Sequence, residues 1–189
     1  TVETIDPVRY IANRSSGRQG HAIAEALARL GAEITLVTGP THQPDPPGVK
    51  VVRVESAVEM NAACQAALPV DVAVCAAAVS DWRPAKPEQQ KIKKNGKGSP
   101  TLALTENPDV LANLAAPGNR RPRLVIGFAA ETESVIENAR AKLAKKGCDW
   151  IVANDVSPAT GVFGGERNTV HLVSAANIES WQTMTKTDT

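Results

Sequence analysis

The residues best suited to chemistry stand in Ser15-Ser-Gly-Arg-Gln-Gly20, directly ahead of an apolar helical pattern. Ser16 and Gln19 have the spacing of a capping box, which predicts that the helix begins here. Gly17 and Gly20 carry no side chain that would keep a ligand away from the backbone amides. Because amides at a helix N-terminus attract anions, we predict that this turn binds a phosphate group.

Two familiar phosphate motifs do not fit the turn. It is not a Walker A loop, since no Gly-Lys-Ser/Thr follows the glycines. The dinucleotide fingerprint GxGxxG lacks its first glycine, and Thr38-Gly39 stands where an acidic ribose ligand is expected. A glycine turn that serves only the close packing of a helix therefore stays open as an alternative.

A second candidate site follows the buried strand predicted over 70–79. Ala76-Ala-Ala78 would let a ligand lie against the backbone, and Asp81 comes just beyond. Ligands of open α/β sheets bind at the carboxyl ends of the strands, and a carboxylate there can hold Mg²⁺ or a ribose hydroxyl. The alternative for the alanines is that they fill space beneath a helix.

Lysines form two further groups. Lys91-Ile-Lys-Lys94 precedes the hairpin signal Asn95-Gly96, and the strand-like 101–104 follows it, which predicts a basic flap within 83–106. A mobile lysine there could stabilise charge in a phosphoryl or nucleotidyl transfer, although a solvated face is the ordinary alternative. Lys142 and Lys146 share one face of a predicted helix, where the helix dipole alone would favour them.

Short β-branched runs alternate with helical patterns, so we predict an α/β fold with a Rossmann-like, doubly wound, mainly parallel sheet. One domain, 1–189, accounts for the length, with 83–106 as a flap region inside it. Strands are predicted over 33–37, 49–54, 70–79, 124–128, 150–153 and, as the last one, 169–173. Helices are predicted over 19–30 and 57–67, from Asn107 as N-cap with Pro108 first in the helix, and over 134–146 with Gly147 closing it.

Composition excludes several classes of protein. The 189 residues carry 21 basic and 20 acidic side chains, so a nucleic-acid binder that depends on excess positive charge is not expected. The three cysteines lack CxxC spacing, and the three histidines are scattered. We therefore predict neither a zinc site nor a disulfide framework. No apolar stretch approaches the roughly 20 residues that span a bilayer. We expect a cytoplasmic protein without nucleic-acid or membrane partners.

The motifs together resemble the phosphopantothenate–cysteine ligase family over nearly the whole chain and in the same order. They are Asp6-Pro-Val-Arg9, Asn13-Arg-Ser-Ser-Gly-Arg-Gln-Gly20, Ala76-Ala-Ala-Val-Ser-Asp81, Lys91-Ile-Lys-Lys94, Asn107-Pro-Asp109, Gly127-Phe-Ala-Ala-Glu-Thr132 and Ala153-Asn-Asp155. The resemblance implies a ligase of coenzyme A biosynthesis, usually the carboxy-terminal half of a bacterial polypeptide whose first half is a flavin-dependent decarboxylase. It also implies a homodimer.

The resemblance implies a reaction in two steps. The carboxylate of 4'-phosphopantothenate attacks the α-phosphate of CTP and releases pyrophosphate, and the amine of cysteine then attacks the acyl-cytidylate and expels CMP. Mg²⁺ would neutralise the triphosphate. Asn13 would bind phosphopantothenate and stabilise the intermediate, Lys91 would close over it, and Arg9 would reach a neighbouring subunit's site. Ala77 and Ala78 would contact the acyl substrate.

The nucleotide contacts implied by the same resemblance are more numerous. The triphosphate would lie on Ser15, Ser16, Gly17 and Gly20, and Asp81 would contact the nucleotide and hold the metal. Phe128 would lie beside the cytosine, while Lys142 and Lys146 match nucleotide-binding lysines. The remaining nucleotide contacts would be Cys75, Ala76, Ala77, Lys91, Pro108, Asp109, Val110 and Leu111.

The chain departs from the family pattern at both ends. The first strand of the family, which should precede Thr1 to Pro7, is absent from the sequence, as is most of a terminal helix after Trp181. We expect that both were trimmed from something longer.

Two other functions stay open. A reductase that uses NAD(P)H would share the sheet, but Tyr10, the only tyrosine, is followed four positions later by Arg14 rather than lysine. A nucleotide-binding module without catalysis would not need Asn13 and Lys91 at these places.

Overall fold

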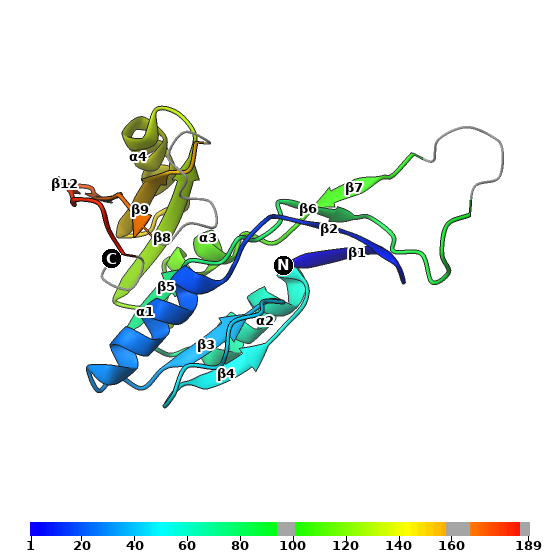
Figure 1. Ribbon diagram of the computed structural model, residues 1–189, viewed down its shortest axis with the longest axis horizontal. Helices are drawn as coiled ribbons and strands as arrows, with labels where there is room; N and C mark the ends of the chain where they lie inside the picture. Colours follow the sequence, from blue (N-terminus) through cyan, green and yellow to red (C-terminus); the bar gives the residue numbers. More distant parts are fainter. Residues whose placement is uncertain (94–100, 158–166, 186–189) are drawn as a thin grey trace.

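A computed structural model describes residues 1–93, 101–157 and 167–185 of the chain (Figure 1). Helices and strands alternate through most of it. The helices are α1 (Arg18–Arg29), α2 (Ala57–Ala67), α3 (Val110–Ala115) and α4 (Val135–Lys146). The strands are β1 (Val2–Asp6), β2 (Arg9–Ala12), β3 (Thr35–Thr38), β4 (Lys50–Arg53), β5 (Val72–Cys75), β6 (Trp82–Pro84), β7 (Leu104–Glu106), β8 (Leu124–Glu131), β9 (Trp150–Asp155), β10 (Arg167–Asn168), β11 (Val170–Ser174), β12 (Ile178–Ser180) and β13 (Met184–Thr185).

The main sheet has five strands in the order β12-β11-β9-β8-β5. β5, β8 and β9 run parallel, and β11 and β12 join them antiparallel. β3 and β4 form a separate parallel pair. The α/β class is as predicted, and the main sheet is mixed, with two parallel and two antiparallel pairings. Two details differ: β5, predicted to be a buried strand, lies at an edge of the sheet, and β12 and β13 follow the strand that was expected to be last.

One face of the main sheet carries the larger core. Val125 and Ala129 of β8 point the same way as Ile151 and Ala153 of β9, because the two strands pair in register, and all four side chains have no exposed surface. α3 and α4 cover this face. Gly127 makes the close approach of α3 possible, since a Cβ there would lie 2.6 Å from a methyl group of Leu111.

A second core joins the β3–β4 pair to the rest of the molecule. Met60 of α2 packs with Val110 and Leu114 of α3, and Val37 of β3 and Cys75 of β5 border this cluster. Among the described strands, β3 shares no backbone hydrogen bonds with β5. The pair is therefore held to the main sheet by apolar packing, which has no preferred direction.

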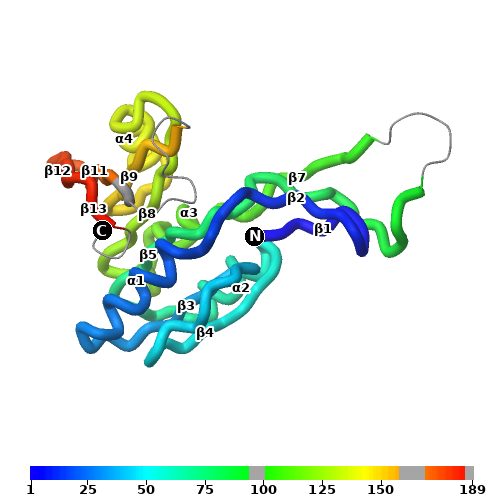
Figure 2. The backbone as a smooth tube through the Cα atoms, viewed as in Figure 1, coloured from blue at the N-terminus to red at the C-terminus, as the bar shows by residue number. Residues whose placement is uncertain are grey.

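The other strands build an arm that extends from this α/β body (Figures 1 and 2). β1 and β2 form an antiparallel hairpin, β6 pairs with β7, and β1 packs against β6. Tyr10, Trp82 and Leu104 on the arm are 62%, 47% and 46% exposed. The arm thus offers large apolar side chains to its surroundings.

The predicted flap is only partly described. Lys91, Ile92 and Lys93 are not in a strand, and β7 pairs with β6 rather than with these residues, so the pairing predicted for the flap hairpin is wrong. The turn signal Asn95-Gly96 lies outside the described residues. The sequence pattern missed β6 because three residues are too few to show an alternation.

Two predicted helix starts are also wrong. Gly17, not Ser16, is the N-cap of α1, and it has a φ of 73° with no side-chain cap. Asp109, not Asn107, is the N-cap of α3, and its carboxylate accepts the amide of Ala112 at 3.0 Å. Elsewhere the helical pattern predicted the boundaries well: α2 has its predicted range, and Gly147 ends α4 in the left-handed conformation. In the described ranges, every helix is too short or too polar to cross a bilayer.

Candidate functional site

The glycine turn at the start of α1 is held from two sides. Thr41, after β3, packs so closely on Gly17 that a Cβ there would lie 2.6 Å from the Thr41 methyl group. The buried His21 places Nδ1 2.9 Å from the carbonyl oxygen of Gly17. Since a carbonyl only accepts, this nitrogen carries the proton. The turn therefore keeps one conformation without help from a ligand.

Serine hydroxyls add local support to the turn. Ser15 Oγ accepts the amide of Gly17 at 3.3 Å, and Ser16 Oγ accepts that of Arg18 at 3.5 Å. Around Gly20, apart from the adjoining backbone of α1, no atom of the described residues lies within 4 Å of where a Cβ would stand. Gln19 Oε1, on the same turn, is covered and has no hydrogen-bond partner among the described residues. The space beside Gly20 and the covered Gln19 oxygen lie where the sequence predicts a phosphate cradle.

Two asparagines hold the loop that follows β5. Asn13 donates through Nδ2 to the carbonyl of Val79 at 3.2 Å. Asn107 donates through Nδ2 to the carbonyl of Ser80 at 2.8 Å and through its backbone amide to that of Asp81 at 2.9 Å. Three consecutive carbonyls are thus fixed. Asn13 thus lies beside the loop that carries Ala78 and Asp81.

Sequence reasoning gave Asn107 the wrong role. Its Oδ1 accepts Arg83 Nη1 at 3.1 Å, and the same guanidinium also donates to the carbonyl of Glu106. Asn107 therefore positions the loop between β5 and β6, instead of capping α3. Asparagine suits this role because its amide side chain can donate one hydrogen bond and accept another at the same time.

Lysines and an aspartate gather beside the carboxyl end of β8. Lys142 Nζ donates to the carbonyl of Phe128 at 2.7 Å, and Lys146 forms an ion pair with Asp109. Burial lowers the pKa of Lys142, against the smaller opposing effect of nearby carboxylates such as Glu131. A half-buried ammonium is less screened by water than a surface one, so its charge acts more strongly on an anion.

Asp109 and Cys75 complete this group. Burial opposes ionisation of Asp109, but the bonds from Lys146 and from the amide of Ala112 outweigh it, and the pKa of Asp109 is lowered. Burial raises the pKa of Cys75 to about 12. The thiol is therefore neutral near pH 7, which fits a packing or contact residue and not a nucleophile.

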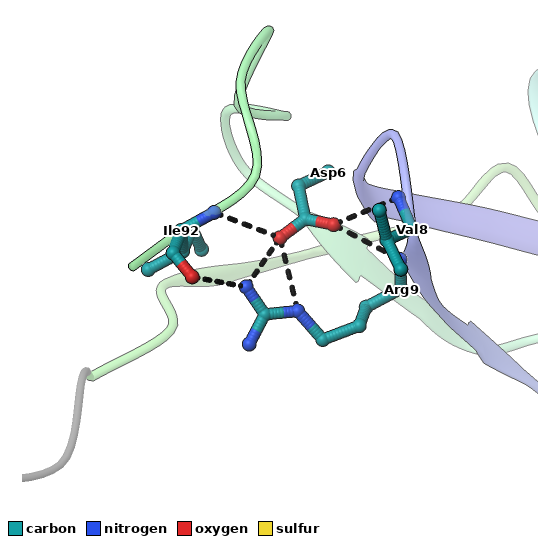
Figure 3. A network of polar contacts seen from close by, with 4 residues as sticks. All are labelled: Asp6, Val8, Arg9 and Ile92. Carbon is teal, nitrogen blue, oxygen red and sulfur yellow. Dashed lines mark hydrogen bonds and ion pairs between the residues drawn. The ribbon is translucent and has the colours of Figure 1, made fainter. Parts of the chain in front are cut away.

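Arg9 and Lys91 lie elsewhere, together on the arm. Arg9 begins β2, whereas Asn13 comes just after its other end, so their Cα atoms are about 13 Å apart along an extended strand. Arg9 donates to the carbonyl of Ile92, the residue next to Lys91 (Figure 3). Arg9 and its contact with Ile92 therefore lie at the opposite end of β2 from Asn13.

Asp6 was not singled out by sequence reasoning as a functional residue. Its side chain has no exposed surface, and it pairs with Arg9 three positions later. An aspartate followed by proline is typical of a turn in which the aspartate side chain accepts the backbone amide two residues later, as Asp6 does with Val8.

Metal ligands do not cluster in the part of the chain that the structure describes, where no three His, Cys, Asp or Glu side chains come together. Asp81, the predicted metal ligand, is exposed at the mouth of the loop held by Asn13 and Asn107. A single carboxylate there fits Mg²⁺, which proteins often hold by one or two carboxylates together with substrate phosphates.

Comparison with known proteins decides the family. The profile of the DNA/pantothenate metabolism flavoprotein C-terminal domain matches residues 1–189. The chain belongs to this family. Among its relatives, the coenzyme A biosynthesis bifunctional protein CoaBC of Escherichia coli K12 is 47% identical over 175 residues, which are 91% of this chain and 43% of that protein. The CoaBC of Mycobacterium tuberculosis is 45% identical over 190 residues, 95% of this chain and 45% of that protein.

Solved structures agree with membership of the flavoprotein C-terminal domain family. The C-terminal domain of a CoaBC bifunctional protein superposes with a TM-score of 0.79 at 37% identity, covering 100% of this chain and 84% of that one. The DNA/pantothenate metabolism flavoprotein from Streptococcus pneumoniae gives 0.81 at 25% identity, covering 100% and 90%. The resemblance drawn from the motifs is confirmed at the level of the family. The chain spans less than half the length of these curated relatives.

Proposed function

We propose that this chain is a CTP-dependent ligase that joins 4'-phosphopantothenate to cysteine in coenzyme A biosynthesis. The observation that carries the proposal is the gathering of Lys142, Lys146 and Asp109 beside the carboxyl end of β8, in a member of a family that includes CoaBC proteins. Such an edge of a parallel sheet is where α/β folds bind ligands.

The proposed chemistry has two steps. The carboxylate of phosphopantothenate attacks the α-phosphorus of CTP, the bond to the β-phosphate oxygen breaks, and pyrophosphate leaves. The amine of cysteine then attacks the acyl carbon of the acyl-cytidylate, loses a proton, and CMP leaves. Activation is needed because a free carboxylate is a poor electrophile. Mg²⁺ held at Asp81 would neutralise charge on the triphosphate.

The residues divide this work by position. The Ser15 to Gly20 turn offers amides at the start of α1 for the phosphates, and Lys142 and Lys146 add positive charge. Lys146 exchanges its bond with Asp109 for one with CTP. Asn13, fixed on the carbonyl of Val79, lies beside the loop assigned to the acyl substrate. Cys75, Ala76, Pro108, Val110, Leu111 and Phe128 surround the base and ribose.

We also propose a homodimer, which the placement of Arg9 and Lys91 supports. The Cα atoms of Arg9 and Asn13 are about 13 Å apart along β2, which favours an arrangement in which the arm of a second subunit brings Arg9 to the site of Asn13. The exposed Tyr10, Trp82 and Leu104 give the arm apolar surface for that contact. The relatives are named bifunctional and this chain spans less than half of their length, which supports the proposed fusion to a flavin-dependent decarboxylase. We also propose that the enzyme is cytoplasmic.

The direct test follows pyrophosphate release from full-length protein with phosphopantothenate, cysteine, CTP and Mg²⁺. We expect turnover that requires phosphopantothenate, cysteine and CTP. Consumption of NADPH, which we do not expect, would instead indicate a reductase. Nucleotide binding without turnover would favour a module that only binds.

The residue that sharpens this test is Asn13. Asn13→Asp places a negative charge beside the predicted acyl-cytidylate, so we expect slower amide formation and accumulation of the intermediate, seen by mass spectrometry of quenched reactions. Asn61→Asp is the matched control. Asn61 of α2 accepts an exposed hydrogen bond from Asn113 of α3, and neither residue belongs to the proposed site. Normal kinetics in Asn13→Asp would refute the assigned role.

A further inference from the structure

A buried carboxylate organises the far end of the hairpin β1–β2. Asp6 Oδ1 accepts the amides of Val8 and Arg9, both at 2.9 Å, which closes the turn. Asp6 Oδ2 accepts Arg9 Nε at 2.9 Å, a second bond from the same guanidinium, and the amide of Ile92 at 3.1 Å. These donors favour the ionised form and lower the pKa of Asp6, with the Arg9 side chain as the largest cause.

Asp6 and Arg9 also bind the backbone of Ile92, which lies more than 80 residues away in sequence (Figure 3). Ile92 donates its amide to Asp6, and its carbonyl accepts Arg9 Nη2 at 2.9 Å. The two peptide groups that flank Ile92 are thus both fixed. A further bond, from the amide of Glu88 to the carbonyl of Ile5 at 2.8 Å, lays the segment 88–92 along the end of β1.

We propose that Asp6 is a positioning residue of the ligase, which acts through Arg9 and the backbone of Ile92 to place Lys91. This rests on the proposed function. The carbonyl of Lys91 belongs to the same peptide group as the amide that Asp6 accepts, so this bond restrains the main chain of Lys91 at its carbonyl end. Its side chain is exposed and free to reach a bound intermediate.

A consequence concerns the assignment of Arg9. Arg9 and Lys91 belong to one network in one chain, so they serve the same site, whichever subunit supplies the rest of it. Arg9 therefore has an intramolecular duty even if its guanidinium, 45% exposed, also meets a ligand.

The first experiment compares Asp6→Asn with Lys91→Gln and the double variant in full-length protein. An amide in place of the carboxylate turns an NH₂ group toward backbone or guanidinium donors, so the grip on Ile92 weakens. Since a misplacement of about 1 Å can cost about 100-fold in rate, we expect amide formation 10- to 100-fold slower in Asp6→Asn, with an unchanged KM for CTP. Because Asp6 acts through Lys91, the double variant should be no slower than Lys91→Gln within about twofold.

A control variant and a replacement variant accompany this comparison. Asp45→Asn removes an exposed ion pair with Arg53, 2.7 Å long and outside the proposed site, and should leave the rates unchanged. If Asp6→Asn does not fold, Arg9→Lys serves instead, because Arg9 is partly exposed and lysine keeps the charge without the forked contact. Effects of Asp6→Asn and Lys91→Gln that multiply in the double variant would overturn the proposal.

Hydrogen exchange tests the grip without any reaction. The amide of Ile92 should exchange at least tenfold faster in Asp6→Asn, whereas that of Val125, bonded to Asp149 at 2.7 Å in the main sheet, should not change. Equal exchange of Ile92 in both proteins would overturn the proposal. If the wild type proved to have no ligase activity, the proposed function would fail while this readout still reported on the network.

Mixed dimers test the shared site. If Arg9 and Lys91 of one chain serve one site, a dimer of one Arg9→Lys and one Lys91→Gln subunit has a defect at both sites, and its activity stays below half that of wild type. Restoration of one fully active site per dimer would show that the two residues serve different sites, which would overturn this part of the proposal.

Discussion

Replacing Gly17 by alanine should destabilise the protein, whereas the same change at Gly20 should stabilise it. Gly17 has a φ of 73°, and its added Cβ would lie 2.6 Å from Thr41 Cγ2 and 3.0 Å from Thr41 Cβ. The left-handed backbone costs alanine about 1–2 kcal/mol and the overpacking about 1–3 kcal/mol, so we expect a loss of about 2–5 kcal/mol. Gly20 lies within α1 with nothing near its Cβ, so alanine should add about 0.5–1 kcal/mol.

Equilibrium urea unfolding of the two variants measures these differences. Thr41→Ser removes the methyl group that lies nearest to the new Cβ, so Gly17→Ala with Thr41→Ser should recover part of the loss and retain the backbone cost of about 1–2 kcal/mol. A Gly17→Ala protein as stable as wild type would refute both the left-handed turn and the close approach of Thr41.

Gly20→Ala also tests the phosphate cradle, because it separates stability from binding. If a phosphate lies on the amides beside Gly20, the new methyl group should raise the KM for CTP by about tenfold, which corresponds to about 1.4 kcal/mol, in a protein that is more stable. A stabilised variant with an unchanged KM would leave the turn with a purely steric role.

Three further predictions concern charged side chains. Because burial lowers the pKa of Lys142, CTP affinity should fall with rising pH before a free lysine at about 10.4 would titrate, and Lys142→Met should lack this alkaline limb when KM is measured from pH 7 to 10. Asp109→Ala should lose about 1 kcal/mol by thermal unfolding because the cap of α3 is gone, whereas Asp109→Asn should lose little. Since the pKa of Asp6 is lowered in the fold, its contribution is present at neutral pH and is lost as pH falls below the unfolded value of about 3.9. The difference in Tm between wild type and Asp6→Asn should therefore shrink between pH 4 and pH 2.

Helices could be predicted from the sequence because their signals are local and repeated. The pattern of 57–67 matches α2, and Gly147 marked the end of α4 because a left-handed residue favours glycine. Helix starts were less predictable. Ser16 and Asp109 are both good caps by residue type, but α1 begins after Gly17, which is left-handed and packs against Thr41, and no residue near Ser16 predicts that contact.

Strand order and the composition of the site depend on contacts far apart in sequence. β5 was predicted to be a buried strand because its residues are apolar, yet it lies at an edge, since only pairing decides which strands are neighbours. Asn13 beside the loop after β5 fits the residues assigned to one site, whereas Arg9 and Lys91 lie apart from it because β2 is extended. Asp6 could not be ranked by residue type, since its importance comes from Ile92, which no local pattern connects to it.

The two hydrogen bonds of Ile92 fix the backbone next to Lys91 to the β1–β2 hairpin. A residue between two strands is usually placed by its neighbours along the chain. Here Ile92 is bonded to the β1–β2 hairpin, so Asp6 and Arg9, more than 80 residues away in sequence, help to place the main chain of Lys91. We therefore expect relatives to present a lysine at this place wherever an aspartate and an arginine stay three residues apart at the hairpin turn.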